Sequence, residues 1–433
     1  MTGRFDQRAL GRRIDWKLIF CWIALVAVGI LSIYSTIHNS GVGILDPDGR
    51  SGKQFIWFCA ALVVGYVVIF VLKPHIWEVL SLPGYLAVLV LLVAVIVFGV
   101  TVNGSRSWFE LGPLRFQPAE ISKLTTALLV AHLLRGSGMK MSRRHDILLL
   151  LGVIGLPMAI ILCEGETGSV LVYLGLLFVL YREGLSGWWI VLIAACIVLF
   201  IITIKYPLWV SFLVLAVMLG AYALLVLRSS RGSSNRTATR RDLRIMVALL
   251  AVAGTIFIFS TNFVFSRVLK PYQKERIEVL LGMTQDIRGA GYNVHQSMIA
   301  IGSGGFAGKG YLKGTQTTYG FVPEQSTDFI FCTIGEEGGF LGCLAVILLY
   351  VFLIARVIRD AEQCREPFTR VYGYCFASCV FMHLIINVGM TIGLMPVIGI
   401  PLPFVSYGGS SLMSFSLMLF IFLALYAQEK KYF

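Results

Sequence analysis

Charged residues are scarce in this sequence. Only 14% of its 433 residues are Asp, Glu, Lys or Arg, whereas 57% are hydrophobic; a soluble protein has about 25% charged residues. This scarcity excludes a water-soluble domain. Apolar runs of roughly 20 residues, the length that crosses a bilayer, recur from end to end instead. We therefore predict a single integral membrane domain over residues 1–433.

Several familiar kinds of site are also missing. Most of the nine cysteines lie in apolar segments with no close pair in an outward loop, which argues against disulfides and thiolate metal sites. The six histidines are scattered, so no zinc motif emerges. Ser406 and Ser410 lack a nucleophile elbow, so serine hydrolysis is unsupported. The net charge of +13 does not indicate nucleic acid, because basic residues beside membrane spans are first explained by orientation and by anionic membrane lipid.

The apolar runs predict an all-α polytopic bundle of about twelve transmembrane helices. An even number of crossings puts both termini on one side, and most Lys and Arg residues fall in loops on that side, which identifies it as the cytoplasm. Residues 266–327 then form a long extracytoplasmic loop. The expected spans lie at about 17–38, 54–72, 81–102, 119–135, 146–163, 168–182, 187–204, 208–227, 244–265, 328–357, 371–389 and 409–427.

One outward segment, residues 103–123, is dense in functional side chains. It is too short and irregular for a span, and we interpret it as an interfacial or re-entrant segment. Arg106 and Arg115 suit phosphate as bidentate donors. Trp108 suits a sugar or a lipid, although a tryptophan at the membrane interface is commonplace.

The same segment leads into a helix with a predicted ion pair. Pro118 is typical of a first helical position, and Glu120 and Lys123 are three residues apart, so they share a face. Lys123 is a further candidate for holding phosphate. An ion pair this close to the bilayer is more often functional than decorative.

The long loop ends in carboxylates at the mouth of a span. Asp328 either caps the following helix or acts as a partly desolvated base that takes a proton from an attacking hydroxyl. Glu336 and Glu337 lie among glycines that permit close helix packing, so we interpret them as buried structural partners. A third polar segment, residues 387–411, is broken by proline and glycine, as in helices that line a shielded cavity.

Three stretches together resemble signature segments of the SEDS family, named for shape, elongation, division and sporulation. The RodA branch, for rod shape, is more similar than the FtsW branch, for division. The resemblance covers most of the chain outside 184–265, where two helices beyond the family's usual ten are expected. The stretches are GSRSWFELGPLRFQPAEISK, GYNVHQSMIAIGSGGFAGKGYLKGTQTTYGFVPEQSTDFIFCTIGEEGGFLG and GLMPVIGIPLPFVSYGGSS.

The resemblance implies a peptidoglycan glycosyltransferase that polymerises lipid II at the outer face of the bacterial cytoplasmic membrane during cell-wall elongation. It implies a class B penicillin-binding protein as transpeptidase partner, alongside other elongation proteins. Asp328 matches the essential loop aspartate, Trp108 a functionally important tryptophan, and Glu120 and Lys123 the polar pair lining the central cavity. A family segment that usually reads Pro-Asp-Leu-Gly-Thr is here residues 165–169, in which Glu166 keeps the acid.

These observations combine into a mechanism. Asp328 would act as general base on a sugar hydroxyl, which attacks the anomeric carbon of a second lipid-linked molecule and expels its lipid pyrophosphate. Lys123, Arg106 and Arg115, with or without a divalent cation such as Mg²⁺ or Mn²⁺, would stabilise the departing charge. The alternatives are a lipid-linked precursor flippase or other transporter, a division-type polymerase, and a scaffold for a synthase.

Overall fold

The computed structural model divides the chain into two compact units, Met1–Leu185 with Asn293–Phe433, and Ser186–Tyr292. The two termini, predicted to be cytoplasmic, lie outside the described residues. The structure describes residues 13–38, 41, 43–102, 105–112, 114–136, 143–229, 236–269, 274, 277–278, 281, 283 and 290–429.

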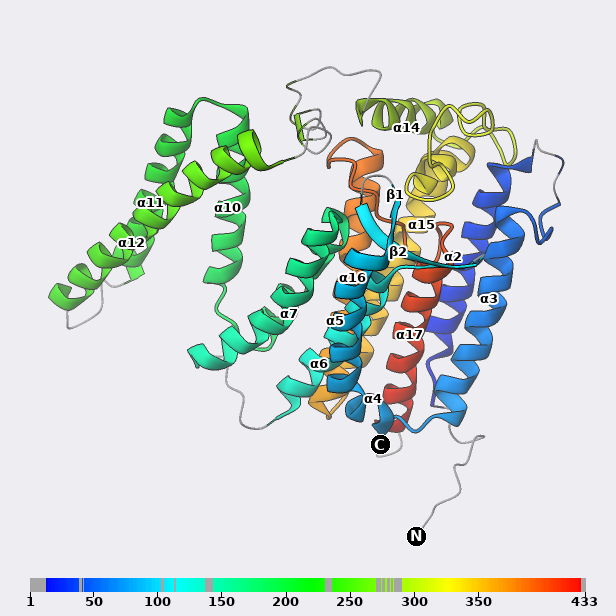
Figure 1. The fold of residues 1–433 in the computed structure, drawn as a ribbon, viewed down its shortest axis with the longest axis horizontal. Coiled ribbons are helices and arrows are strands. Elements are labelled where there is room, and N and C mark those ends of the chain that lie inside the picture. Colours follow the sequence, from blue (N-terminus) through cyan, green and yellow to red (C-terminus); the bar gives the residue numbers. More distant parts are fainter. Residues whose placement is uncertain are drawn as a thin grey trace, which may run out of the picture. The chain divides into compact units, whose positions relative to one another are not determined.

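The first unit is a helical bundle (Figure 1). A small sheet and α14 lie at one end of this bundle, and α4 lies at the other. Its helices are α2 (Trp16–Ser35), α3 (Arg50–Tyr66) with the π-helical extension η2 (Val67–Val71), α4 (His75–Val79), α5 (Ser81–Phe98), α6 (Pro118–Arg135), α7 (Arg144–Glu164), α8 (Thr167–Tyr173), α9 (Leu176–Arg182), most of α14 (Ala290–Gly304), α15 (Ile330–Glu362), α16 (Pro367–Thr391) and α17 (Gly409–Glu429).

Ten helices in the described part of the chain are long and apolar enough to cross a membrane. The mostly helical membrane fold is therefore as predicted. The twelve expected spans differ from these ten at two places, although both places are helical. Helix α6 carries three charged residues, which makes it too polar to qualify. The segment predicted at 168–182 is divided into the short helices α8 and α9.

Helix α6 begins and ends as its sequence predicts. Pro118 lies in its first turn, where the missing N–H costs nothing. Glu120 in the first turn and Arg135 in the last complement the helix dipole. Most of the helix between them is buried, so its polar groups lie inside the bundle rather than against lipid.

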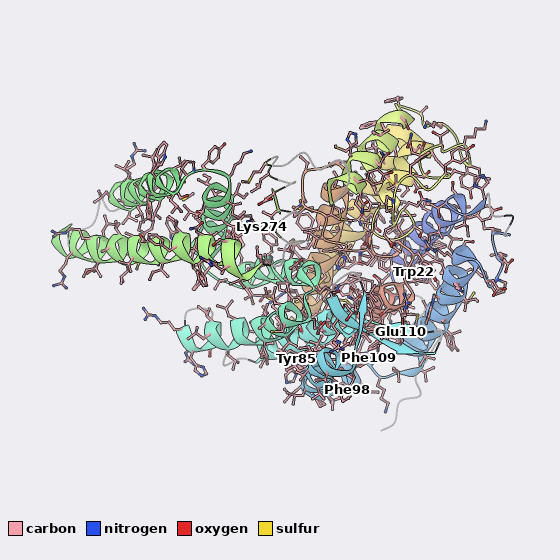
Figure 2. All side chains as sticks on the ribbon, turned by 45° about the horizontal axis from the view of Figure 1, so that its top comes forward. Trp22, Tyr85, Phe98, Phe109, Glu110 and Lys274 are labelled. Atoms are coloured by element: carbon pink, nitrogen blue, oxygen red, sulfur yellow. The ribbon has the colours of Figure 1, made fainter. Side chains whose placement is uncertain are left out.

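The segment expected to be irregular instead forms an antiparallel sheet of β1 (Val100–Val102), β2 (Ser105–Leu111) and β3 (Leu114–Phe116), in that order. Strand β2 packs on α5, and Phe109 and Glu110 project from it near the end of α5 that carries Phe98 (Figure 2). The sheet leads directly into α6, so it fixes where α6 begins.

Helices α16 and α17 form the centre of the first unit, because they are the most buried of the apolar helices. Trp22 of α2 is fully buried against α17: its indole Nε1 donates to Ser416 Oγ at 3.0 Å, and its ring meets that of Phe420 edge-on. Figure 2 marks Trp22 on α2. The indole N–H thus has the partner that a buried tryptophan needs.

Helix α15 is kinked at Gly339, which has a φ of +62° that disfavours any residue but glycine. The backbone of Gly308, also at positive φ, lies directly against it. A Cβ on either glycine would collide with the backbone of the segment that carries the other glycine. The kink therefore depends on a close backbone contact between α15 and the turn that follows α14.

The second unit consists of α10 (Trp188–Lys205), α11 (Leu208–Ser229) and α12 (Arg236–Phe263), which continues as the π-helical η4 (Val264–Val268). It has a core of its own, in which Leu199, Leu215 and Ile258 are buried. Few other side chains on these helices are buried, and exposed apolar residues such as Leu192, Leu213 and Leu249 lie on all three, as expected for helices that face lipid. The predicted extra region, 184–265, falls largely within this unit.

Candidate active site

Asp328 lies two residues before the first residue of α15. The N-cap position of that helix is Phe329, with no side-chain capping bond, so the structure does not place Asp328 where a helix-capping aspartate would lie. Its side chain is half-buried. A Cβ built on Gly399 would lie 3.2 Å from Asp328 Oδ2, and Gly399 is exposed with a φ of +73°. A side chain at position 399 would crowd the Asp328 carboxylate, whereas glycine leaves the space beside Oδ2 open.

The backbone that carries Asp328 is held by the segment after α16. Ser406 Oγ donates to the carbonyl of Thr327 at 2.6 Å, and the N–H of Tyr407 donates to the carbonyl of Ser326 at 2.8 Å. Arg50, at the start of α3, donates to Ser326 Oγ at 2.6 Å. Two separate parts of the chain therefore fix the turn before Asp328.

The predicted pair on α6 is present and deeply buried. Lys123 Nζ lies 2.7 Å from Glu120 Oε1, and the two residues are 1% and 2% exposed. Lys123 Nζ also lies 3.0 Å from His383 Nε2 of α16 and over the ring of Phe415 of α17. The ammonium is thus enclosed by one carboxylate, one imidazole and one aromatic face.

Glu166, the acid of the segment that departs from the family pattern, lies beside the start of α6. Gln117 Nε2 donates to Glu166 Oε2 at 2.5 Å, and Ser169 Oγ donates to Glu166 Oε1 at 2.6 Å. Gln117 is the N-cap residue of α6. Oε2 of Glu166 therefore holds the α6 N-terminus to the α7–α8 turn, while Oε1 is engaged within the first turn of α8.

Trp108 and Arg115 share one face of the sheet, whereas Arg106 does not join them by simple alternation. Trp108 and Glu110 lie two residues apart in β2 and point the same way, and Arg115 lies opposite Glu110 and pairs with it at 2.9 Å. The register between β1 and β2 shifts between the pairs Thr101–Arg106 and Val100–Trp108, and this bulge interrupts the alternation between Arg106 and Trp108. Arg106 and Arg115 are exposed, whereas Trp108 is half-buried. The face with Trp108 therefore presents one guanidinium group beside one indole ring.

The structure thus groups the predicted residues into three places: the sheet, the α6 pair and the turn at Asp328. The sequence did not single out His383 and Asn387, which link the last two. Asn387 Nδ2 donates to the carbonyls of Asp328 and Ile400 at 2.8 and 2.7 Å. Polar side chains four residues apart in an apolar span were the signal that could have found them.

A metal site is not built from these groups. Among the residues that the structure describes, no three or more His, Cys, Asp or Glu side chains gather in a way that could hold an ion. The described residues therefore supply no ready-made set of three such ligands for Mg²⁺ or Mn²⁺.

Comparison with known proteins gives matches over nearly the whole chain. It is 32% identical over 400 residues to the peptidoglycan glycosyltransferase MrdB of Escherichia coli (strain K12), which covers 92% of this chain and 90% of MrdB. It is 31% identical over 428 residues to the peptidoglycan glycosyltransferase RodA of Treponema pallidum (strain Nichols), covering 92% and 94%. A probable FtsW, from Coxiella burnetii (strain RSA 493 / Nine Mile phase I), is 27% identical over 419 residues, covering 92% and 94%.

The fold and the family profile agree with these relatives. A solved chain from a peptidoglycan synthase complex, described as coordinating polymerization and crosslinking, superposes with a TM-score of 0.67 at 27% identity, covering 96% of this chain and 98% of that one. The profile of the FtsW/RodA/SpoVE cell cycle proteins matches residues 15–231 and 241–431. The chain therefore belongs to this family, which is the SEDS family that its three motifs predicted.

Proposed function

We propose that this protein is a peptidoglycan glycosyltransferase that polymerises lipid II, with Asp328 as its general base. The main observation behind the proposal is the position of Asp328, a half-buried carboxylate on a turn that two other parts of the chain hold, with exposed Gly399 beside its Oδ2. A carboxylate fixed at the edge of the protein interior can meet a substrate hydroxyl and accept its proton. The names of the relatives supply the reaction class.

In the proposed reaction, a sugar hydroxyl of one lipid-linked molecule gives its proton to Asp328. Its oxygen then forms a bond to the anomeric carbon of a second molecule. The bond from that carbon to the lipid pyrophosphate breaks, and the pyrophosphate leaves with the electron pair. Holding both sugars beside one fixed base removes much of the entropic part of the barrier.

The departing pyrophosphate needs positive charge. Arg106 and Arg115 are exposed on the sheet, and a guanidinium pairs well with phosphate oxygens. Trp108, on the same face as Arg115, offers a ring for a sugar or a lipid chain. We therefore assign the sheet to the pyrophosphate and the groups next to it.

Glu120 and Lys123 stay in the proposed site as the buried polar pair beside α16. Lys123 Nζ already contacts Glu120 and His383, so contact with a pyrophosphate would require it to exchange a buried partner. The contacts of the Arg residues on the sheet are exposed instead: Arg115 pairs with Glu110, and Arg106 donates to the carbonyl of Ile96. Exchanging an exposed partner costs less, so these two residues come first in our assignment of leaving-group contacts.

We place the reaction at the outer face of the bacterial cytoplasmic membrane, with both termini in the cytoplasm. The distribution of Lys and Arg supports this orientation. Greater identity to MrdB and RodA than to FtsW supports a role in elongation. A class B penicillin-binding protein is the proposed partner, because the described site has no acyl-transfer machinery and the solved relative belongs to a synthase complex.

Purified protein incubated with fluorescent lipid II tests the reaction class. Glycan strands that a muramidase digests are expected. Movement of lipid II across liposome membranes without polymer would indicate a transporter instead. Inactivity both alone and with the co-purified transpeptidase would indicate a scaffold and overturn the proposal.

A further inference from the structure

The break between α16 and α17 leaves backbone carbonyls without helical partners. Residues 394–405 form no regular helix, and three prolines there supply no N–H groups. Inside a membrane protein such carbonyls need other donors. Side chains provide them: His383 Nδ1 lies 2.9 Å from the carbonyl of Pro401, and Asn387 Nδ2 lies 2.7 Å from that of Ile400.

The contacts of His383 define its tautomer. Lys123 Nζ is a donor, so His383 Nε2 accepts from it, and Nδ1 must carry the hydrogen that goes to the Pro401 carbonyl. The ring is fully buried and packs edge-on against Phe415. His383 therefore joins the α6 pair to the broken segment through two directional bonds and one aromatic contact.

Asn387 continues the same connection one helical turn further along α16. Its amide nitrogen donates both of its hydrogens, one to the carbonyl of Ile400 and one to that of Asp328 at 2.8 Å. The residue is fully buried. Gly399, the neighbour of Ile400, lies against the Asp328 carboxylate itself. One amide thus fixes both the backbone of Asp328 and the backbone beside its side chain.

We propose that His383 and Asn387 are positioning residues that hold Asp328 in a fixed relation to the Glu120–Lys123 pair. This inference rests on the proposed function, because the placement of the Asp328 carboxylate matters for turnover only if Asp328 is the general base. Neither residue touches substrate in the proposal. Their loss displaces the base, so kcat falls while KM stays close to its normal value.

Two substitutions of His383 separate its two bonds. His383→Asn keeps a donor near the Nδ1 position for Pro401 but removes the acceptor for Lys123. His383→Gln keeps an acceptor near the Nε2 position but loses the bond to Pro401. Coupling through the ring predicts that both variants lower kcat, by about 10- to 100-fold. If His383 only satisfies the Pro401 carbonyl, His383→Asn has near-normal kcat, and the inference is overturned.

Asn387→Leu removes both amide bonds at similar volume, and a fall in kcat of about 10- to 100-fold is expected. Thr391→Val is the matched control: Thr391 is fully buried one turn further along α16, and its hydroxyl bonds only within that helix. The control is expected to keep normal kcat. If Asn387→Leu cannot be purified, Asn387→Ser, which retains one donor, takes its place with a smaller expected fall.

A double-mutant comparison distinguishes positioning from general damage. In an Asp328→Asn protein, residual turnover measured at high enzyme concentration should not fall further when Asn387→Leu is added. A full additional loss would mean that Asn387 acts through the fold, and the inference would fail. Near-normal turnover by Asp328→Asn itself would instead refute the proposed base. An inactive Asp328→Asn with fully active His383 and Asn387 variants would refute this inference alone.

Discussion

Lys309 and Glu336 form an ion pair, with Lys309 Nζ lying 2.6 Å from Glu336 Oε1, although they are 27 residues apart. Glu336 is fully buried, as the sequence interpretation expected of a structural partner. Its carboxylate also accepts the backbone N–H groups of Thr315, Gln316 and Thr317. A single side chain at the start of α15 therefore organises the turn that precedes the segment leading to Asp328.

We expect Glu336→Gln to lower the free energy of unfolding by about 1–3 kcal/mol. The amide places an NH₂ group where a carboxylate oxygen accepts backbone N–H groups, which leaves buried donors without an acceptor. The melting temperature of the purified protein should therefore fall. Asp48→Asn, an exposed substitution, is the control, and equal melting temperatures for the two variants would contradict the anchoring role.

Asp328→Asn should reduce polymerisation about 10²–10⁴-fold, the usual contribution of acid–base catalysis. The amide preserves size and cannot take the proton. Turnover of fluorescent lipid II by equal amounts of folded protein measures the effect. Glu324→Gln, at an exposed carboxylate four residues earlier, should retain activity. An active Asp328→Asn enzyme would remove Asp328 from the chemistry.

Lys123→Met should destabilise the protein by about 3–5 kcal/mol, because it leaves the Glu120 carboxylate buried without its cation. Adding Glu120→Gln should recover much of that loss, since the double variant buries no charge. Thermal unfolding checks both statements. Polymerisation should stay low in the double variant, so a stable and fully active double variant would show that the pair serves only the fold.

The topology predicts opposite labelling at two exposed positions. Tyr319→Cys, in the loop at 266–327, should react with an impermeant maleimide added to intact cells, and Lys73→Cys should react only after the cells are opened. Both are made in a background without the native cysteines. Labelling of Lys73→Cys in intact cells to the level of Tyr319→Cys would refute the orientation.

The sequence predicted those parts of the fold that depend on local patterns. Apolar runs located the membrane helices, and a spacing of three residues correctly paired Glu120 with Lys123. The three motifs identified the family. The apolar runs and the ion pair could be predicted because each pattern lies within one segment of about 20 residues or fewer. The family could be predicted because the three motifs resemble its signature segments.

The parts that sequence reasoning missed depend on partners far away in the chain. The sheet was mistaken for an irregular segment because its strands are short and rich in charge, and pairing such as that of Glu110 with Arg115 is visible only once the strands meet. Asn387 is the first residue of the broken segment at 387–411, but nothing in the sequence singled it out. Its role depends on a bond to the Asp328 carbonyl, 59 residues earlier in the chain.

The contact between Gly308 and Gly339 has a consequence for how this protein can vary. Where a side chain overfills an ordinary core, trimming a neighbouring side chain makes room. Here the atoms nearest to each glycine are backbone atoms of the other segment. There is therefore no neighbouring side chain that could be shortened to make room. Both positions also have positive φ, which strains any replacement. No second substitution can therefore compensate for a side chain at either glycine. We expect both positions of the Gly308–Gly339 contact to remain glycine as the sequence of this protein changes.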